Sequence, residues 1–193
     1  MNDLDLTPAT TALLLMDLQP GILGRHPDAD AFLARLGRVR EAARAASLTV
    51  GYVRVAITAE EAATISPRSR FAPAAASGQL DADSPATQID PRIAPADGEI
   101  VVRKQRVGAF STTDLREQLD ARGIHTLVLA GVSTSGVVLS TVRDAADRDY
   151  RLIVLEDGCW DSDPEVHRVL MTKVFASGGV TVMSAEEAIA ALA

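Results

Sequence analysis

The stretch Ile124-His-Thr-Leu-Val-Leu-Ala-Gly-Val132, followed by Ser133-Thr-Ser-Gly-Val137, decides the fold class of this chain. Its apolar centre, residues 126–130, has the length of a strand, and a second run of this kind occupies residues 12–16. Continuous apolar runs are typical of strands that are buried on both faces of a parallel sheet. A helix is predicted directly after this strand, over residues 134–149. The order of strand, loop and helix indicates an α/β fold.

Strands and helices alternate in the same way along the rest of the chain. The pattern predicts strands at residues 11–16, 48–57, 99–103, 124–132, 151–156 and 180–183, and helices at 28–46, 111–122, 134–149, 164–175 and after Ser184. Asp28, and Ser184 with Glu187, are residue types that cap helix N-termini. The proline-rich segment 58–97 is expected to be mostly irregular, with one short helix near residues 60–64. We therefore predict a single domain over residues 1–193, a six-stranded parallel sheet with helices on both faces.

Composition and charge exclude several classes of function. A chain with 47% hydrophobic and 23% charged residues is globular rather than disordered. No apolar run approaches the roughly 20 residues that cross a bilayer, and the acidic start Met1-Asn-Asp-Leu-Asp5 lacks the features of a signal peptide. The net charge of −7 opposes attraction to nucleic acid and to anionic lipid. We expect a cytoplasmic protein that binds a small molecule, not nucleic acid or a membrane.

Cysteine and histidine are too sparse for the common metal and disulfide motifs. Cys159 is the sole cysteine, so the chain has no internal disulfide and no CxxC motif. The histidines His26, His125 and His167 are widely separated in the sequence and show no HExxH spacing. The loop at residues 131–137 has neither GxxxxGK[ST] nor GxGxxG, the patterns of nucleotide-binding loops. We expect no metal and no cofactor.

In open α/β sheets, ligands bind beyond the carboxyl ends of the strands. The positions that follow predicted strands are Asp17, Lys104, residues 131–137 and residues 157–160. One acid, one base and a loop of small residues that opens a helix would therefore meet in one crevice. Free N–H groups at such a helix start are suited to a developing oxyanion.

These positions resemble the isochorismatase-like hydrolases. The resemblance is carried by Leu14-Leu-Met-Asp17-Leu-Gln19, Val101-Val-Arg-Lys104, Phe110-Ser-Thr-Thr-Asp-Leu115 and Gly131-Val-Ser-Thr134 with Thr141-Val-Arg-Asp144-Ala145, in the family's order over almost the whole chain. It implies a six-stranded parallel sheet and a homodimer or larger homo-oligomer. It also implies a catalytic triad of Asp, Lys and Cys, and a cis peptide between Val132 and Ser133.

Carried over residue by residue, the triad matches at Asp17 and Lys104 but not at the cysteine. Val137 occupies the position of the nucleophile. A valine has no nucleophilic or hydrogen-bonding atom, so the amidase mechanism, in which cysteine attacks a carbonyl, is absent as written. Isochorismatases proper have glycine at this position and cleave an enol ether, with the Asp as general acid. Here Gly136 stands one place early. The resemblance does not extend to the nicotinamidase metal site, because residues 56–61 contain no histidine.

Further residues are candidates for the site with competing structural interpretations. The oxyanion loop would comprise Ser133, Thr134 and Val137, and Lys104 would lower the pKa of Asp17. The possible substrate pocket is lined by side chains of loops beyond strand ends and of the long segment, namely Phe71, Arg106, Phe110, Trp160, Arg70 and His26. The alternatives are surface ion pairs for the arginines and core or interface packing for the aromatics. Cys159, His125 and His167 are interpreted as structural or surface residues.

Two functional hypotheses remain open from the sequence. The first is a hydrolase of a small organic molecule that cleaves an amide or enol-ether bond without a cysteine nucleophile, with Asp17 as general acid or base. The second is a catalytically inactive relative that binds a small ligand or a partner protein through the same pocket. Val137 favours the second hypothesis, and the intact Asp17/Lys104 pair favours the first.

Overall fold

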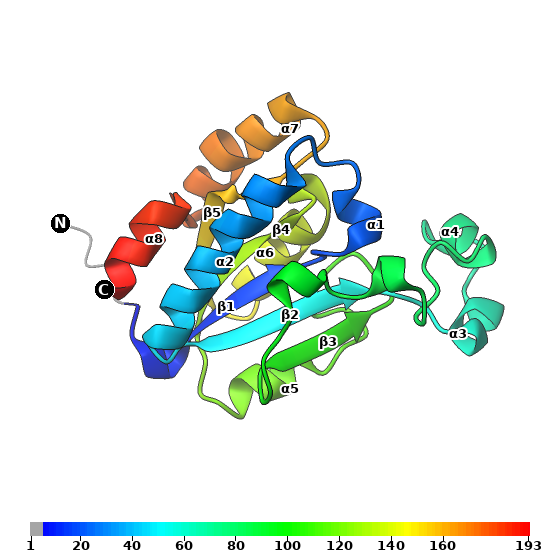
Figure 1. Cartoon of the computed structure of the whole chain (residues 1–193), viewed down its shortest axis with the longest axis horizontal. Helices are drawn as coiled ribbons and strands as arrows, with labels where there is room; N and C mark the ends of the chain where they lie inside the picture. Colours follow the sequence, from blue (N-terminus) through cyan, green and yellow to red (C-terminus); the bar gives the residue numbers. More distant parts are fainter. Residues whose placement is uncertain (1–5) are drawn as a thin grey trace.

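The computed structural model describes residues 6–193, so the acidic start at residues 1–5 lies outside the described residues. The structure confirms the predicted fold class: one α/β domain with a six-stranded sheet in which every neighbouring pair of strands is parallel (Figure 1). The strands are β1 (Thr11–Met16), β2 (Thr49–Val55), β3 (Ile100–Lys104), β4 (Thr126–Val132), β5 (Arg151–Trp160) and β6 (Thr181–Met183).

The strand order β3-β2-β1-β4-β5-β6 creates a switch point between β1 and β4. The chain runs outward from β1 to β3, then returns to the other side of β1 with β4 and continues to β6. At such a point the loops beyond two neighbouring strands diverge and leave a crevice. Asp17 directly follows β1, and Ser133 directly follows β4.

Helices cover both faces of the sheet. One face packs against α2 (Ala29–Ala45) and α8 (Ala185–Leu192). The other packs against α5 (Leu115–Asp120), α6 (Leu139–Ala146) and the π-type turn Leu170–Phe175 that follows α7 (Pro164–Val169). β1 contributes to both cores, because alternate side chains of a strand point to opposite faces: Leu14 and Met16 lie in one core, Leu13 and Leu15 in the other.

Local signals predicted several helix ends correctly. The side chain of Asp28 accepts a hydrogen bond from the N–H of Ala31, and Ser184 and Glu187 form a capping box. The helix expected from residue 111 begins only at Leu115, since Thr112 adopts a left-handed φ of 62° that interrupts helical geometry. Similarly, the first turn after β4 is a π-type turn, Thr134–Val138, and α6 begins after it.

The segment 58–97 is more helical than the sequence analysis expected. Besides the predicted short helix, α3 (Ala59–Thr64), it contains α4 (Ala72–Ala76) and two short 3-10 helices, Pro85–Thr87 and Pro91–Ile93. Each of the three additional elements has proline at its first or second position, where the fixed φ of proline favours a helix start. A further short helix, α1 (Pro20–Leu23), starts in the same way. Figure 1 shows α3 and α4 projecting beyond the carboxyl ends of β2 and β3.

Within residues 6–193, no helix has the length and apolar character that crossing a bilayer requires.

Candidate active site

Asp17 and Lys104 form a buried ion pair at the carboxyl edge of the sheet. Lys104 Nζ donates a hydrogen bond to Asp17 Oδ2 at 2.8 Å and a second to the carbonyl of Arg106 at 3.1 Å. The side chain of Lys104 is only 1% exposed and that of Asp17 only 7%, so water screens the attraction between their charges weakly. Lys104 ends β3 and reaches Asp17 across the end of β2, which lies between β3 and β1. The strand order therefore brings together two residues that are 87 positions apart.

The second oxygen of Asp17, Oδ1, is buried and has no hydrogen-bond partner among residues 6–193. Burial raises the pKa of Asp17, and the ammonium group of Lys104 lowers it by a smaller amount. The expected effect of Lys104 is thus present, but the cost of desolvating the carboxylate outweighs it. A carboxyl group with a raised pKa and an unpartnered oxygen is suited to exchanging a proton with a bound molecule.

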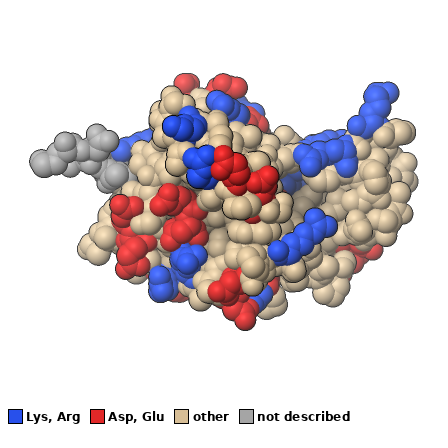
Figure 2. Space-filling view, turned by 90° about the horizontal axis from the view of Figure 1, so that it is seen from above, with Lys and Arg blue, Asp and Glu red and all other residues tan. Residues whose placement is uncertain are grey.

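A cavity of about 730 Å³ opens beside this pair and is called the main cavity here. The wall formed by the ends of β1, β3 and β4 includes Asp17, Lys104, Ser133 and Val137. Other parts of the lining come from residues within segment 70–87, from the loop and short helix at 19–25, and from residues 160–162. Figure 2 shows a hollow in the face that carries these loops, with basic side chains on both sides of it.

The loop after β4 has the cis peptide between Val132 and Ser133 that the resemblance implied. Asp161 binds this loop: its Oδ2 accepts the N–H of Ser135 at 2.7 Å and the Ser135 hydroxyl at 2.6 Å. The N–H of Gly136 donates to the carbonyl of Ser133. The N–H groups of Ser135 and Gly136, which lie between the predicted oxyanion residues Thr134 and Val137, therefore already have acceptors within the protein. A carboxylate at Ser135 would also repel a developing oxyanion.

Comparison with known proteins agrees with this arrangement. Residues 11–187 match the isochorismatase domain. The chain belongs to the isochorismatase family. It is 34% identical over 182 residues to the isochorismatase family protein YecD of Escherichia coli O157:H7, an alignment that covers 89% of this chain and 91% of that protein. Over 149 residues it is 34% identical to an N-carbamoylsarcosine amidase of an Arthrobacter species, covering 77% of this chain and 56% of the amidase.

Solved structures of the isochorismatase family have the same fold. An isochorismatase family protein from Burkholderia thailandensis superposes with a TM-score of 0.84 at 28% identity and covers 95% of this chain and 96% of its own. The N-carbamoylsarcosine amidase of Thermoplasma acidophilum superposes with a TM-score of 0.75 at 26% identity, covering 92% and 97%. These relatives place the domain among hydrolases that act on small molecules.

In this isochorismatase-family chain, Val137 lies beside the main cavity and is 2% exposed. The sole cysteine, Cys159, is buried in the apolar core, and its Sγ lies 3.9 Å from the carbonyl of Leu129. Burial raises the pKa of the Cys159 thiol to about 12. Since the thiolate is the nucleophile and is scarce at neutral pH, Cys159 is a structural residue here.

The predicted pocket residues divide into three groups. Phe71, Arg70 and Trp160 line the main cavity. Arg106 lines a neighbouring cavity instead. Phe110 lies in the core, stacked on Tyr150 with ring centroids 5.8 Å apart, and lines neither cavity, which differs from the expectation. Its position after β3 suggested exposure, but the ring turns toward the helical layer that contains α6.

The two histidines near the loops have packing roles. His26 stacks on Phe32 and lies beside Trp160, with ring centroids 4.7 and 4.9 Å apart. Nδ1 of His167 lies 2.8 Å from the hydroxyl of Thr134, which is completely buried and does not line the main cavity. His167 is thus half-buried against the loop rather than a free surface residue, and Thr134 holds the loop from behind.

Sequence reasoning missed the residues that attach segment 58–97 to the sheet. Buried Gln19 bonds both β2 and the segment: its Nε2 donates to the carbonyls of Val55 at 2.9 Å and Thr87 at 2.7 Å, and its Oε1 accepts the Val55 N–H. Arg54 also donates to the Thr87 carbonyl, at 3.0 Å. The position of Gln19, two residues after Asp17, was the available signal.

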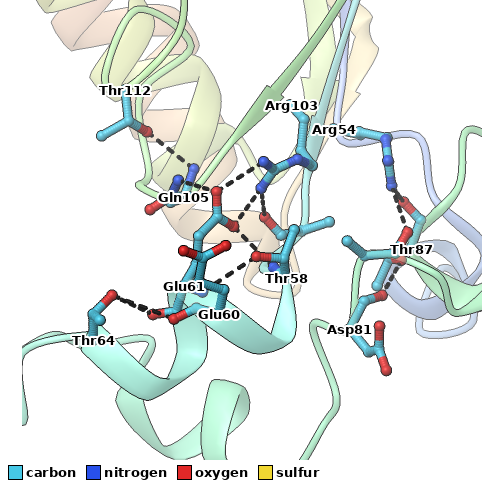
Figure 3. Close-up of polar contacts among 12 residues, drawn as sticks. Arg54, Thr58, Glu60, Glu61, Thr64, Asp81, Thr87, Arg103, Gln105 and Thr112 are labelled. Carbon is cyan, nitrogen blue, oxygen red and sulfur yellow. Dashed lines mark hydrogen bonds and ion pairs between the residues drawn. The ribbon is translucent and has the colours of Figure 1, made fainter.

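Glu61 makes a second attachment (Figure 3). Its carboxylate receives two hydrogen bonds from Arg103, at 2.6 and 2.8 Å, and one from Gln105 at 2.6 Å, while also capping α3 through Thr58. The Arg103 guanidinium lowers the pKa of Glu61 to about 2. These bonds fix α3 to β3, the strand that carries Lys104.

Among residues 6–193, no group of three or more His, Cys, Asp or Glu side chains is placed to hold a metal ion.

Proposed function

We propose that this chain hydrolyses a small organic molecule by acid–base chemistry, without a cysteine nucleophile. The observation that carries the proposal is the buried Asp17/Lys104 pair beside the main cavity, whose lining also includes the apolar Val137. A buried charged pair costs desolvation energy, and structure alone does not require one at the edge of a cavity. Its retention supports a chemical role.

In the proposed reaction Asp17 transfers the proton. Its Oδ1 has no partner in the part of the chain that the structure describes and is available to a ligand atom. Burial raises the pKa of Asp17, which makes its carboxylate a stronger base, so that Asp17 is able to accept a proton and to donate one to a leaving group. Lys104 holds the other oxygen in place and stabilises the carboxylate once the proton has left.

Two features favour acid-assisted cleavage over acyl transfer to the protein. Val137 offers no atom that forms a covalent bond with substrate. In addition, the Asp161 carboxylate accepts the hydrogen bond of the Ser135 N–H, so this group is not free to stabilise a tetrahedral oxyanion. An enol ether that is cleaved after protonation meets both conditions. An amide attacked directly by water meets the first condition, because no covalent bond to the protein forms, but its tetrahedral intermediate would need another donor than the Ser135 N–H. Relatives named N-carbamoylsarcosine amidase and ureidoacrylate amidohydrolase support the amide class.

The proposed scheme needs no metal or cofactor. On the family resemblance we also infer a cytoplasmic homodimer or higher homo-oligomer. Sedimentation velocity of the purified protein tests the oligomeric state directly, and a monomer at micromolar concentration would contradict it.

The test of function incubates the protein with isochorismate and a panel of small amides and enol ethers, with products identified by mass spectrometry. Asp17→Asn and the surface control Asp97→Asn are assayed in parallel. We expect turnover to fall by several powers of ten in Asp17→Asn and to persist in Asp97→Asn, whose residue is exposed and remote from the cavity lining. Equal rates in Asp17→Asn and wild type would refute the assignment.

A second candidate function is binding without turnover, favoured by the buried valine and by the carboxylate already bound to the Ser135 amide. In that case a metabolite captured by the protein would be recovered chemically unchanged. Conversion of every bound compound would eliminate this alternative.

A further inference from the structure

A second cavity of about 570 Å³ adjoins the main cavity and is called the arginine cavity here. The two cavities share Arg70, Phe71 and Val107 in their linings. The arginine cavity adds Arg68 and Arg106, which the main cavity lacks. It lies outside the Asp17/Lys104 site but opens onto the same segment of chain.

Its arginines have no carboxylate partners among the described residues. Arg106 donates only to the carbonyl of Gln105, at 2.8 Å, and Arg70 lies over the Phe71 ring, 5.7 Å from its centroid. The single acidic residue in the lining, Asp144, pairs with Arg148 at 2.6 Å and is thereby neutralised. Most other arginines of the chain, such as Arg44 and Arg92, bind carboxylates.

This concentration of unpaired positive charge runs against the composition of the chain. The net charge is −7, yet Arg68, Arg70 and Arg106 meet around one cavity, and Arg25 stands at the lining of the next. Figure 2 shows basic side chains on both sides of the hollow, whereas basic and acidic side chains are intermixed elsewhere on that face. Guanidinium groups bind planar oxyanions through paired hydrogen bonds. The hollow therefore has the electrostatic character of an anion site.

The arginine cavity is linked to the reactive pair through the backbone. Lys104 Nζ donates to the carbonyl of Arg106, so the residue whose side chain faces the arginine cavity also fixes the ammonium group that holds Asp17. A molecule extending past Arg70 and Phe71 would reach both cavities.

We propose that the arginine cavity binds an oxyanion, carboxylate or phosphate, of the same small molecule whose reactive bond lies at Asp17. The substrate is thus an organic anion with its charge separated from the reacting bond by a short spacer. The position of that bond rests on the proposed function, whereas the anion site rests on Arg68, Arg70 and Arg106 alone.

Binding of matched probes tests the proposal by calorimetry. Succinamate, glutaramate and adipamate carry an amide and a carboxylate on spacers of increasing length, and the corresponding diamides lack the charge. The ω-carbamoyl alkylphosphonates distinguish a phosphate site from a carboxylate site. Each probe is titrated into wild type, Asp17→Asn, Arg70→Gln, Arg106→Gln and the control Arg122→Gln. The control removes an exposed arginine that donates to the Gln118 carbonyl and lines neither cavity.

At one spacer length we expect the anion to bind at least about tenfold more tightly than its diamide. A hydrogen bond to a charged group contributes a binding free energy that corresponds to about this factor in Kd. The preference should fall in Arg70→Gln and Arg106→Gln, weaken with salt, and remain in Arg122→Gln. Equal binding of anions and diamides, or of no probe at all, would overturn the proposal. So would inorganic phosphate that binds without competing with the preferred probe.

Binding and turnover separate the two proposals. If the preference for charged probes persists in Asp17→Asn and turnover is unaffected by that substitution, the proposed function is wrong and the anion site is retained. If turnover depends on Asp17 but charged and uncharged probes bind equally well, the anion site is wrong and the proposed function is retained.

Discussion

A single carboxylate oxygen of Asp161 joins it to Ser135 twice, accepting the backbone N–H at 2.7 Å and the hydroxyl at 2.6 Å. Ser135 lies two residues before Val137, in the first turn after the cis peptide. The carboxylate of Asp161 therefore already binds the N–H of Ser135 in the turn that follows β4. Under the proposed function, this contact and Val137 both favour acid–base chemistry over covalent catalysis.

Removal of this contact should loosen the loop. We expect Asp161→Ala to lower the free energy of unfolding by about 1–2 kcal/mol, because the Ser135 N–H loses a charged acceptor at a helix start. Asp161→Asn keeps an oxygen there and should cost less. Urea denaturation measures both, with Asp97→Ala as a control at an exposed position. A loss no larger than the control's would show that the contact contributes nothing to stability.

Lys104→Met should raise the pKa of Asp17 further. Burial, which raises this pKa, remains, while the ammonium group that lowers it is gone. A ¹³C NMR titration of the Asp17 carboxyl measures the change, and any activity that needs the protonated acid should extend to higher pH. Since the folded state then binds this proton more tightly than the unfolded chain, stability should fall as pH rises above about 4. An unchanged or lowered pKa would contradict the prediction.

Val137→Cys tests whether residue 137 faces the reactive pair. The introduced thiol would lie in the lining of the main cavity, to which Lys104 also belongs, and a positive charge in the same cavity favours the thiolate, so we expect it to react with iodoacetamide in the native state. Wild type should stay unlabelled, because Cys159 is buried and its thiol has a pKa of about 12. Peptide mass spectrometry locates the label. Equal labelling at position 159 would disprove the distinction.

Glu61→Gln should release the attachment of segment 58–97. The pKa of Glu61 is lowered from 4.5 to about 2, so its contribution to stability is complete above the unfolded value and is lost as pH falls toward 2. We expect the variant to be less stable by about 1–3 kcal/mol at pH 7 and equal to wild type near pH 2. Hydrogen exchange of residues 58–64 should increase in parallel.

Glu60→Gln is the matched control for that experiment, since the neighbouring Glu60 side chain is exposed and Arg103 binds only Glu61 of the two. If both variants respond alike, the effect comes from the charge of α3 as a whole and not from the contact with Arg103.

The sequence by itself determined the strands, their parallel arrangement, the caps at Asp28 and Ser184, and the positions of Asp17 and Lys104 at strand ends. These features depend on residue types within a few positions of one another, because strand burial and helix capping are local. Even the missed helices α1 and α4 had a local signal, a proline in the first turn.

Only the tertiary structure decided which strand ends meet. The 2.8 Å contact of Lys104 with Asp17 requires β3, β2 and β1 to lie in that order, and the Asp161 contact with Ser135 requires the turn after β5 to fold over the loop after β4. The tertiary structure also decided that Phe110 packs in the core and that Arg106 lines the second cavity. The direction of a loop side chain is set by the surfaces that pack around it, and these come from residues distant in the chain.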